Sequence, residues 1–585
     1  AMSWAMDGYI NDYGIANMAE ALAKKGGPKA KEYAEQAEYF RNRAQNYVTM
    51  FDPSVDFFQG KDSAGAWRNP PSTYDPRVWG YDYTETDGWN MAFHVPQDGQ
   101  GLANLYGGRD GLAKKLDKFF ATPETATFYG SYGGPIHEMY EARDVRMGQY
   151  GHSNQPSHHI IYMYDYVGQP HKTQKLVREA TSRLYLGSEI GQGYPGDEDN
   201  GEMSAWQIFS ALGFYPLQMG SPAYAIGSPL FTKATVSLEN GKKIVVNAPG
   251  NSRSNVYVQS LKVNGKKYNS TSLPHSLLAD GATLDFKMGP SPSRWGTGEN
   301  AAPPSLTTGD AVANPLRDLT GPGRGTASDP TLVDDTSTTQ VTFPTPTPAW
   351  QYQFAGAGEQ ATYYTLTSGT VAGDPKAWRL RGSYDGTTWT TIDERADQSF
   401  DWRQQTRPFK IAAPGRYAHY RLEVSANTGE ASTTLAEVEL LGIPAPACTT
   451  TISDKVAGAV SVRSGVTCVT AGAQITGPVS VAKDASLYVT GAALDAAVRA
   501  TGAGTVSLLN STVSGPLTVT GSGPVSVENS TLKSAVTLLA NKEATVVAGN
   551  TIGGPLTCAG NKPAPVNNGL PNKTGGIRLG QCGKL

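Results

Sequence analysis

The chain has 585 residues and a formal net charge of −3, so its charge gives no reason to expect nucleic acid or a membrane surface as a partner. This length suggests about three or four domains, and its apolar runs stay shorter than the ~20 residues that a membrane span requires. The cysteines Cys448, Cys468, Cys558 and Cys582 all lie in the last quarter, which suggests disulfides formed in an oxidising, extracellular compartment.

Residues 1 to about 220 are predicted to be helical. Ile15, Met18, Ala19, Leu22 and Ala23 recur with the 3.6-residue period of an amphipathic helix. The pattern begins at once, without the charged head of a signal peptide, so we expect a fragment that starts inside a domain. The loops carry many aromatic side chains, which suit sugar binding because C–H faces of sugars stack on rings; ordinary core packing is the alternative.

After residue 220 the pattern changes to strands. Alternating runs at 234–238, 243–246 and 256–258, with Asn240-Gly241 and Asn264-Gly265 as turns, predict a β-strand unit over 221–297. Residues 298–345 are rich in Gly, Pro, Thr and Asp, which favours a linker and the start of another module.

Strand alternation returns over 346–444. The stretches 374–389 and 435–440 resemble discoidin-like (coagulation factor 5/8 type C) modules. That resemblance implies a β-sandwich, a fold whose relatives often bind sugars through their loops.

The tail, 445–585, contains a repeat. Apolar residues fall 19, 19, 19 and 20 positions apart, at Val479, Val498, Leu517, Val536 and Leu556. A fixed period of small and β-branched residues predicts a β-solenoid. Asn510, Asn529 and Asn550 keep nearly the same period, which favours left-handed corners with stacked side chains over glycosylation sites. We favour the pairings Cys448–Cys468 and Cys558–Cys582 over the two alternatives, with one disulfide capping each end.

Two polar turns in the helical part stand out, at 151–159 and 193–206, each leading into an apolar helical run. Asp197, Glu198 and Asp199 follow one another in the second turn and repel one another unless a cation, a shared proton or solvent intervenes. An acidic turn that caps the following helix is the simpler interpretation of the triplet alone.

The helical part and its β unit resemble family 92 glycoside hydrolases, the calcium-dependent exo-acting α-mannosidases. The resemblance rests on motifs spread over residues 1 to about 295, at 83–90, 95–98, 154–159, 168–174, 196–206, 210–216 and 226–231. It implies an (α/α)6 barrel packed on an N-terminal β-sandwich. That sandwich would be a partner segment of the same protein and would supply part of the mannose pocket.

The resemblance assigns Asp197 and Asp199 to the base side of an inverting reaction. Such a reaction needs one carboxyl group to protonate the leaving oxygen and one carboxylate to activate water. Glu85 matches the general acid, and a position between Tyr83 and Trp89 is expected to raise its pKa through poor solvation.

Further site residues follow from the same resemblance. Calcium is expected on oxygen ligands from Asn154, Gln155 and Glu202, and the sugar against Trp79, Trp89, His158, His159 and Lys172. The family commonly has Glu where this chain has Gln155, and His where it has Gln97. An amide cannot donate a proton as a carboxyl group does. Gln155 is therefore expected in the calcium shell; if it faces the leaving group instead, the substrate needs little acid assistance.

These observations predict a secreted exo-acting α-mannosidase that removes terminal mannose from glycans, with Ca²⁺ as cofactor. A hydrolase of mannose linked through phosphate to another mannose is the nearest alternative. A non-catalytic glycan-binding protein is another, which the presence of Glu85, Asp197 and Asp199 disfavours. Trehalase-like or phosphorylase-like (α/α)6 enzymes are a third possibility that the motifs match less well.

Overall fold

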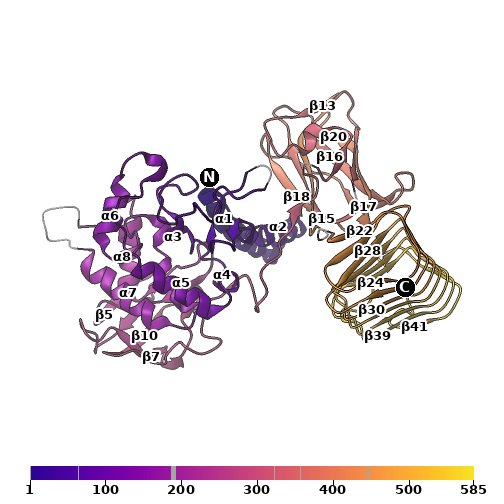
Figure 1. Ribbon diagram of the computed structural model, residues 1–585. Coiled ribbons are helices and arrows are strands. Elements are labelled where there is room, and N and C mark those ends of the chain that lie inside the picture. Colours follow the sequence, from indigo (N-terminus) through magenta and orange to yellow (C-terminus); the bar gives the residue numbers. More distant parts are fainter. Residues whose placement is uncertain are drawn as a thin grey trace. The chain divides into compact units, whose positions relative to one another are not determined.

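The computed structural model describes residues 2–62, 65–185, 193–321, 323–355, 358–444, 446 and 448–585. The chain divides into two compact units, Ala1–Pro315 and Leu316–Leu585, and we describe each by itself (Figure 1). Within the described residues, no helix combines the length and the apolar character that a membrane crossing needs.

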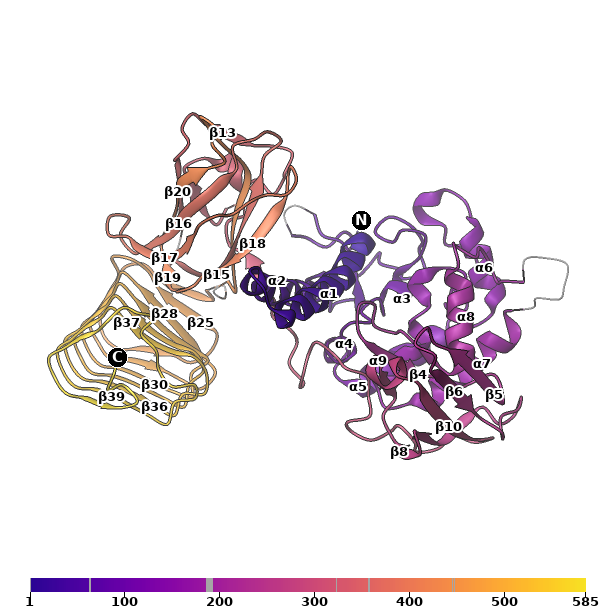
Figure 2. The same ribbon diagram turned by 180° about the vertical axis from the view of Figure 1, so that it is seen from behind.

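The first unit is mainly helical, as the sequence predicts, and α1 and α2 lie side by side in it (Figure 2). Its main helices are α1 (Met2–Lys25), α2 (Ala30–Arg43), α3 (Gly88–Met91), α4 (Gly99–Leu105), α5 (Arg109–Ala121), α6 (His137–Val145), α7 (Pro170–Arg183) and α8 (Glu202–Leu212). Short 3₁₀ turns η3 (Gln155–Ser157) and η4 (Ile160–Asp165) connect them. A closed barrel of six helical hairpins remains a prediction from the family resemblance.

Helix α1 packs on a different face from the one that its periodicity suggested. Met2 and Met6 join the main apolar core, whereas Ile15 and Met18 are 45% and 63% exposed. The helix therefore has apolar residues on two faces, and the described residues cover only one of them. Periodicity identifies a helix but cannot decide between two apolar faces.

Part of the predicted linker 298–345 belongs to the first unit, because it supplies partners for a buried carboxylate. Asp98 is fully buried at the start of α4. It accepts hydrogen bonds from the hydroxyl groups of Ser305 at 2.6 Å, Thr307 at 2.7 Å and Tyr47 at 2.8 Å. A buried charge needs such partners, and composition gives no sign of a contact across two hundred residues.

The strand unit after the helices is one sheet with the order β5-β6-β10-β7-β8. Its strands are β5 (Lys233–Ser237), β6 (Lys243–Asn247), β10 (Ala282–Gly289), β7 (Tyr257–Val263) and β8 (Lys266–Tyr268). Asn264 and Gly265, with φ of 51° and 78°, both lie in the left-handed region. Paired positive φ values fit the tight hairpin predicted between β7 and β8.

The second unit begins with a β-sandwich, and the strands predicted over 346–444 are present. One sheet contains β11 (Arg317–Asp318), β21 (Thr433–Gly442), β15 (Glu359–Ser368) and β18 (Thr406–Lys410), and the other β12 (Gly325–Ala327), β14 (Ala349–Phe354), β20 (His419–Asn427), β16 (Pro375–Ser383) and β17 (Thr390–Arg395). Side chains from both sheets share one core that includes Tyr364, Trp378 and Leu440. The sandwich starts before residue 346, and its relation to discoidin-like modules remains a prediction.

The tail is a β-solenoid, as the 19-residue period predicted, and its turns stack as a regular coil (Figure 1). Its strands form three parallel sheets. The first sheet contains β22 (Thr450–Ile452), β25 (Val466–Val469), β28 (Ser486–Thr490), β31 (Thr505–Leu509), β34 (Val525–Glu528) and β37 (Thr545–Ala548), and the second contains β23 (Lys455–Val456), β26 (Gln474–Ile475), β29 (Ala493–Leu494), β32 (Thr512–Val513), β35 (Thr531–Leu532), β38 (Thr551–Ile552) and β40 (Lys573–Thr574). The third sheet contains β24 (Val460–Val462), β27 (Val479–Val481), β30 (Val498–Thr501), β33 (Leu517–Thr520), β36 (Val536–Leu539), β39 (Leu556–Ala559) and β41 (Arg578–Gly580). The five apolar residues of the repeat pair with one another along the third sheet.

The corners of the solenoid confirm most of the predicted asparagine pattern. Asn510 and Asn529 are left-handed, with φ of 50° and 45°, and the Asn529 side chain donates to the Asn510 side chain at 3.2 Å. At the next turn Gly549 takes the left-handed position. Asn550 is buried instead and accepts a hydrogen bond from the Ser530 backbone N–H at 2.8 Å. The disulfides Cys448–Cys468 and Cys558–Cys582 are those that the sequence favoured.

Candidate functional site

Glu85 lies on a tight loop whose shape is fixed by contacts at both ends. The loop leads into α3, where the Asp87 side chain accepts a hydrogen bond from the Asn90 backbone N–H. Glu85 itself has a φ of 54°, an unusual left-handed conformation for a residue other than glycine. Its backbone N–H donates to the Tyr132 hydroxyl at 2.7 Å, and its carbonyl accepts from the Asn154 amide at 2.7 Å. These bonds hold the backbone while the side chain stays exposed.

The environment of Glu85 differs from the predicted one. Tyr83 and Trp89, expected to desolvate the carboxyl group, are themselves buried and 6% and 3% exposed, whereas Glu85 is exposed. Tyr83 points inward and donates to the Phe58 carbonyl at 2.7 Å. Neighbours in the sequence are separated here because the left-handed turn at Glu85 directs flanking residues to different sides.

Asn154 and Gln155 connect the Glu85 loop to the acidic turn. Asn154 caps η3, where its side-chain oxygen accepts from the Gln155 backbone N–H at 3.0 Å. The Asn154 amide reaches Glu85, and the Gln155 amide donates to the carboxylate of Asp199. Two consecutive amide side chains thus connect the backbone of the predicted acid to the carboxylate of one predicted base, although 114 residues separate Glu85 from Asp199 in the sequence.

The three acidic residues Asp197, Glu198 and Asp199 have different surroundings. Glu198 accepts hydrogen bonds from the Gly201 backbone N–H at 2.6 Å and from the Ser204 hydroxyl at 2.7 Å, so it caps α8. These bonds, the one from Ser204 first, lower the pKa of Glu198. Asp197 and Asp199 are exposed. The helix-capping interpretation of the triplet is therefore correct for Glu198, and the two aspartates are left for another role.

The paired histidines are buried and hydrogen-bonded. Both ring nitrogens of His158 face acceptors, the carbonyl of His152 at 2.8 Å and the carboxylate of Glu202 at 2.7 Å. Because a carbonyl oxygen can only accept, Nε2 of His158 carries a hydrogen, and the contact at Nδ1 fixes the ring against Glu202. His159 donates from Nε2 to the Phe93 carbonyl at 2.7 Å, and burial lowers the pKa of His159 to about 3, so the ring is neutral.

A cavity of about 340 Å³ joins these elements. Glu85, Asn154, Gln155 and His159 line it together with residues that the sequence analysis had not selected. Those residues are Ser3, Trp4, Asp7, Ile10 and Asn11 of α1, with Thr84, Met91, His94, Pro96, Pro156 and Met219. Its described lining holds carboxylates but no lysine or arginine, so it suits a neutral, hydroxyl-rich ligand or a cation better than an anion.

Of the five predicted substrate-binding residues only His159 lines this cavity. His158 is buried against Glu202, and the other three also lie outside the lining. Trp79 is 2% exposed and donates its indole N–H to Glu124 at 3.2 Å. Trp89 packs edge-on against Phe57, with ring centroids 4.9 Å apart. Lys172 forms an ion pair with Asp117 at 2.6 Å. Both tryptophans thus pack as core residues, which was the alternative interpretation of the aromatic loops.

The residues expected to hold a metal contribute oxygen atoms, as a hard cation requires. Asn154 and Gln155 line the cavity, whereas Glu202 is not part of its lining and contacts His158. Among the residues that the structure describes, no group of three His, Cys, Asp or Glu side chains has the spacing of a metal site. A cation at this place would therefore depend on amide oxygens and on groups from the substrate or from water.

The cavity residues of α1 escaped the sequence analysis because their signal is weak. Asp7 and Trp4 are single residues on an apolar helix, and His94 precedes the motif Val95-Pro96-Gln97-Asp98 without being part of it. Only the fold brings them to Glu85. The Ser3 hydroxyl contacts the Thr84 hydroxyl at 3.1 Å, so the first turn of α1 is attached to the Glu85 loop.

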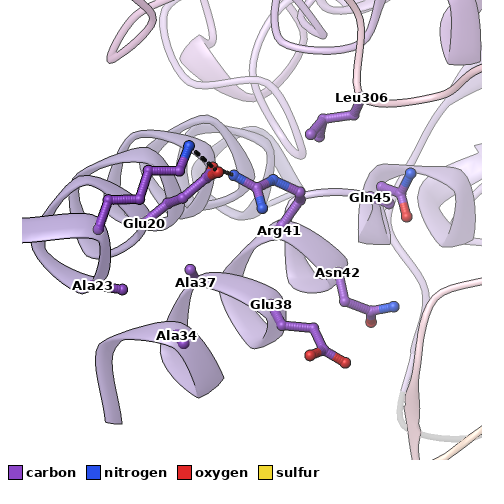
Figure 3. A pocket seen from close by; sticks show the side chains of 10 residues that line it. Glu20, Ala23, Ala34, Ala37, Glu38, Arg41, Asn42, Gln45 and Leu306 are labelled. Atoms are coloured by element: carbon purple, nitrogen blue, oxygen red, sulfur yellow. Dashed lines mark hydrogen bonds and ion pairs between the residues drawn. The ribbon is translucent and has the colours of Figure 1, made fainter. Parts of the chain in front are cut away.

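A second hollow, of about 710 Å³, lies between α1 and α2 (Figure 3). Its charged groups pair with one another, since Glu20 contacts Arg41 at 2.5 Å and Lys24 at 2.6 Å. Small side chains, Ala23, Ala34 and Ala37, form much of its wall. None of the predicted site residues lies there, so the cavity at Glu85 is the better candidate.

Comparison with known proteins identifies a family for the first unit. Residues 1–290 match the model of the glycosyl hydrolase family 92 catalytic domain. An uncharacterized secreted glycosidase of Arthroderma benhamiae is 27% identical over 326 residues, which are 51% of this chain and 37% of that protein.

Two solved structures from Bacteroides thetaiotaomicron are similar to about half of the chain. A family GH92 alpha-mannosidase is 34% identical over 52% of this chain and 37% of its own, with a TM-score of 0.45. A family GH92 inverting mannosidase is 38% identical over 52% of this chain and 40% of its own, also with a TM-score of 0.45. The chain thus spans well under half the length of these relatives. The segment from residue 1 to residue 290, which carries the cavity and Glu85, Asn154, Gln155 and Asp199, belongs to glycosyl hydrolase family 92.

Proposed function

We propose that the protein carrying this chain is an exo-acting α-mannosidase that hydrolyses with inversion. The observation that supports this most is the pair of amide contacts through which Asn154 and Gln155 join the Glu85 loop to Asp199. An inverting hydrolase needs an acid and a base on opposite sides of one sugar, with roughly 6.5–9.5 Å between them. Glu85 and Gln155 line one cavity, and Asp199, which is not part of its lining, is joined to it through the contact with Gln155.

In this mechanism Glu85 donates a proton to the leaving oxygen while Asp199 accepts one from the attacking water. Asp197, two residues away on the same exposed turn, helps to hold that water. The Gln155 amide orients the Asp199 carboxylate by donating to it. Because Gln155 contacts the base and not Glu85, it is placed to serve the water side of the reaction.

We propose a neutral mannoside as the substrate. The described residues that line the cavity include Asp7 and Glu85 but no lysine or arginine. A phosphate group would meet repulsion there, whereas hydroxyl groups find acceptors. The phosphate-linked alternative is therefore the less favoured of the two.

Calcium is proposed as a cofactor, with Asn154, Gln155 and Glu202 as its protein ligands. Amide and carboxylate oxygens are the ligands that it prefers, and it accepts six to eight of them. When bound, the ion would polarise sugar hydroxyl groups. We also propose that the protein is secreted, and that a further segment, an N-terminal β-sandwich, completes the mannose pocket beside the 68% exposed Trp4.

The proposal is tested by incubating the complete gene product with α-1,2-, α-1,3- and α-1,6-mannobiose and with a mannose-phosphate-mannose diester. We expect release of mannose from at least one mannobiose as the β-anomer first, observed by NMR, and loss of activity with a calcium chelator. Cleavage of the diester alone would favour the alternative substrate. Binding without cleavage would favour a glycan-binding protein.

The second unit is expected to be dispensable for the hydrolysis of small soluble mannosides. Deleting residues 316–585 should leave kcat unchanged within about a factor of two, because the candidate acid and base lie in the first unit. Deleting residues 300–585 instead also removes Ser305 and Thr307 from Asp98. That cut should lower Tm measurably, since the buried carboxylate would lose charge-assisted hydrogen bonds. A large fall in kcat for the shorter deletion would contradict the prediction.

A further inference from the structure

The wall of the cavity formed by α1 carries an acidic side chain that the proposed mechanism does not use. Asp7 lines the cavity, and its side chain is 58% exposed. Its Oδ1 contacts Nε2 of His94 at 2.6 Å. A carboxylate can only accept in this contact, so the imidazole hydrogen is on Nε2 and His94 orients Asp7.

His94 is buried, and only one of its two ring nitrogens has a hydrogen-bond partner among the described residues. It is 7% exposed, and its other ring nitrogen, Nδ1, has no hydrogen-bond partner among the described residues. Leaving a buried polar atom unpaired is unfavourable. The position of His94 is therefore explained better by its contact with Asp7 than by its own burial, because that contact fixes an exposed carboxylate on the cavity wall.

Asp7 is held in a fixed relation to Glu85. The Ser3 backbone N–H donates to the Asp82 carbonyl at 3.0 Å, and the Thr84 backbone N–H donates to the Ser3 hydroxyl at 3.1 Å. The first turn of α1 is thereby bonded to the residues that precede Glu85. Asp7 lies one turn further along and borders the same cavity.

We propose that Asp7, oriented by His94, is a sugar-binding residue that accepts hydrogen bonds from hydroxyl groups of the mannoside in the cavity shared with Glu85. Trp4, three residues earlier and on the same side of α1, adds an exposed ring beside it. A ring next to a carboxylate suits a sugar, since C–H groups stack on the ring and hydroxyl groups donate to the carboxylate. This inference rests on the proposed function, because it takes a mannoside as the ligand.

The test compares Asp7→Asn with wild type in the complete gene product, at saturating calcium and over a calcium titration. We expect KM for the cleaved mannobiose, and the dissociation constant of methyl α-mannoside measured by calorimetry, to rise about 10- to 100-fold. That is the range for a lost hydrogen bond to a charged group. Asp7→Glu should recover part of the affinity, and His94→Phe should reproduce part of the loss because Asp7 loses its support.

Glu20→Gln is the matched control, since Glu20 is a half-exposed carboxylate on the same helix that pairs with Arg41 outside the cavity. It should leave KM unchanged. If wild type binds and cleaves the mannoside but Asp7→Asn keeps its KM, the inference is overturned and the proposed function stands. If Asp7→Asn changes only the calcium concentration required, Asp7 serves the cation, and the inference is overturned as well. A wild type that neither binds nor cleaves mannosides would overturn both.

Discussion

Asp199→Asn is expected to abolish turnover on every mannoside, whatever its leaving group. The substitution keeps the size of the side chain and removes the group that accepts the proton of the attacking water. Since water must be activated in every cleavage, kcat should fall by roughly 10²- to 10⁴-fold, the usual contribution of a positioned base. Equal losses on mannobiose and on an aryl mannoside, with nearly unchanged binding of methyl α-mannoside, would identify the step.

Glu198→Gln provides the control for this experiment because it changes the neighbouring acid in the same turn. Glu198 caps α8 through Gly201 and Ser204. Its replacement should lower Tm slightly, because a glutamine accepts these hydrogen bonds less strongly than a carboxylate does, and should leave kcat within a few-fold. If both variants lost turnover equally, the conformation of the turn would matter more than the carboxylate of Asp199, and the assignment of the base would be wrong.

The architecture was largely predictable because each part has its own period. Helical spacing, strand alternation and the 19-residue repeat each follow from a rule about which side chains share a face. The repeat even indicated the disulfide pairs, since cysteines at both ends of a solenoid have few other neighbours. Within the asparagine pattern of the repeat, the difference at Gly549 arises because glycine accepts a left-handed corner as readily as asparagine does.

The site was predictable only where the chain is locally informative. The family motifs indicated Glu85, Asn154, Gln155 and Asp199, and the structure brings these residues together. The motifs could not show that Trp79 and Trp89 point into the core. A loop tryptophan that faces solvent and one that packs beneath the loop can occur in the same sequence context. Asp7 and His94 were missed because their contact joins residues 87 positions apart. Likewise, the bonds from Ser305 and Thr307 to Asp98 are invisible in a segment that has the composition of a linker.

Glu85→Gln should separate substrates by their leaving groups. A sugar is a poor leaving group and needs a proton, so kcat/KM on mannobiose should fall by roughly 10²- to 10⁴-fold. An aryl mannoside with an acidic phenol, or a mannosyl phosphate, leaves without protonation and should be slowed far less. Glu85 is exposed, so its role as an acid depends on this contrast between leaving groups and not on burial.

The same experiment decides what Gln155 does. Its amide contacts Asp199, so Gln155→Glu is expected to disturb the base and slow both substrates alike. Suppose instead that Glu85→Gln slowed the aryl mannoside as severely as the mannobiose, and that Gln155→Glu changed the ratio between the two. Glu85 would then be a binding residue, and the acid would belong at position 155. Because a glutamine there cannot donate a proton to a leaving oxygen, the enzyme would be specialised for substrates that need none, and phosphate-linked mannose would become the favoured substrate.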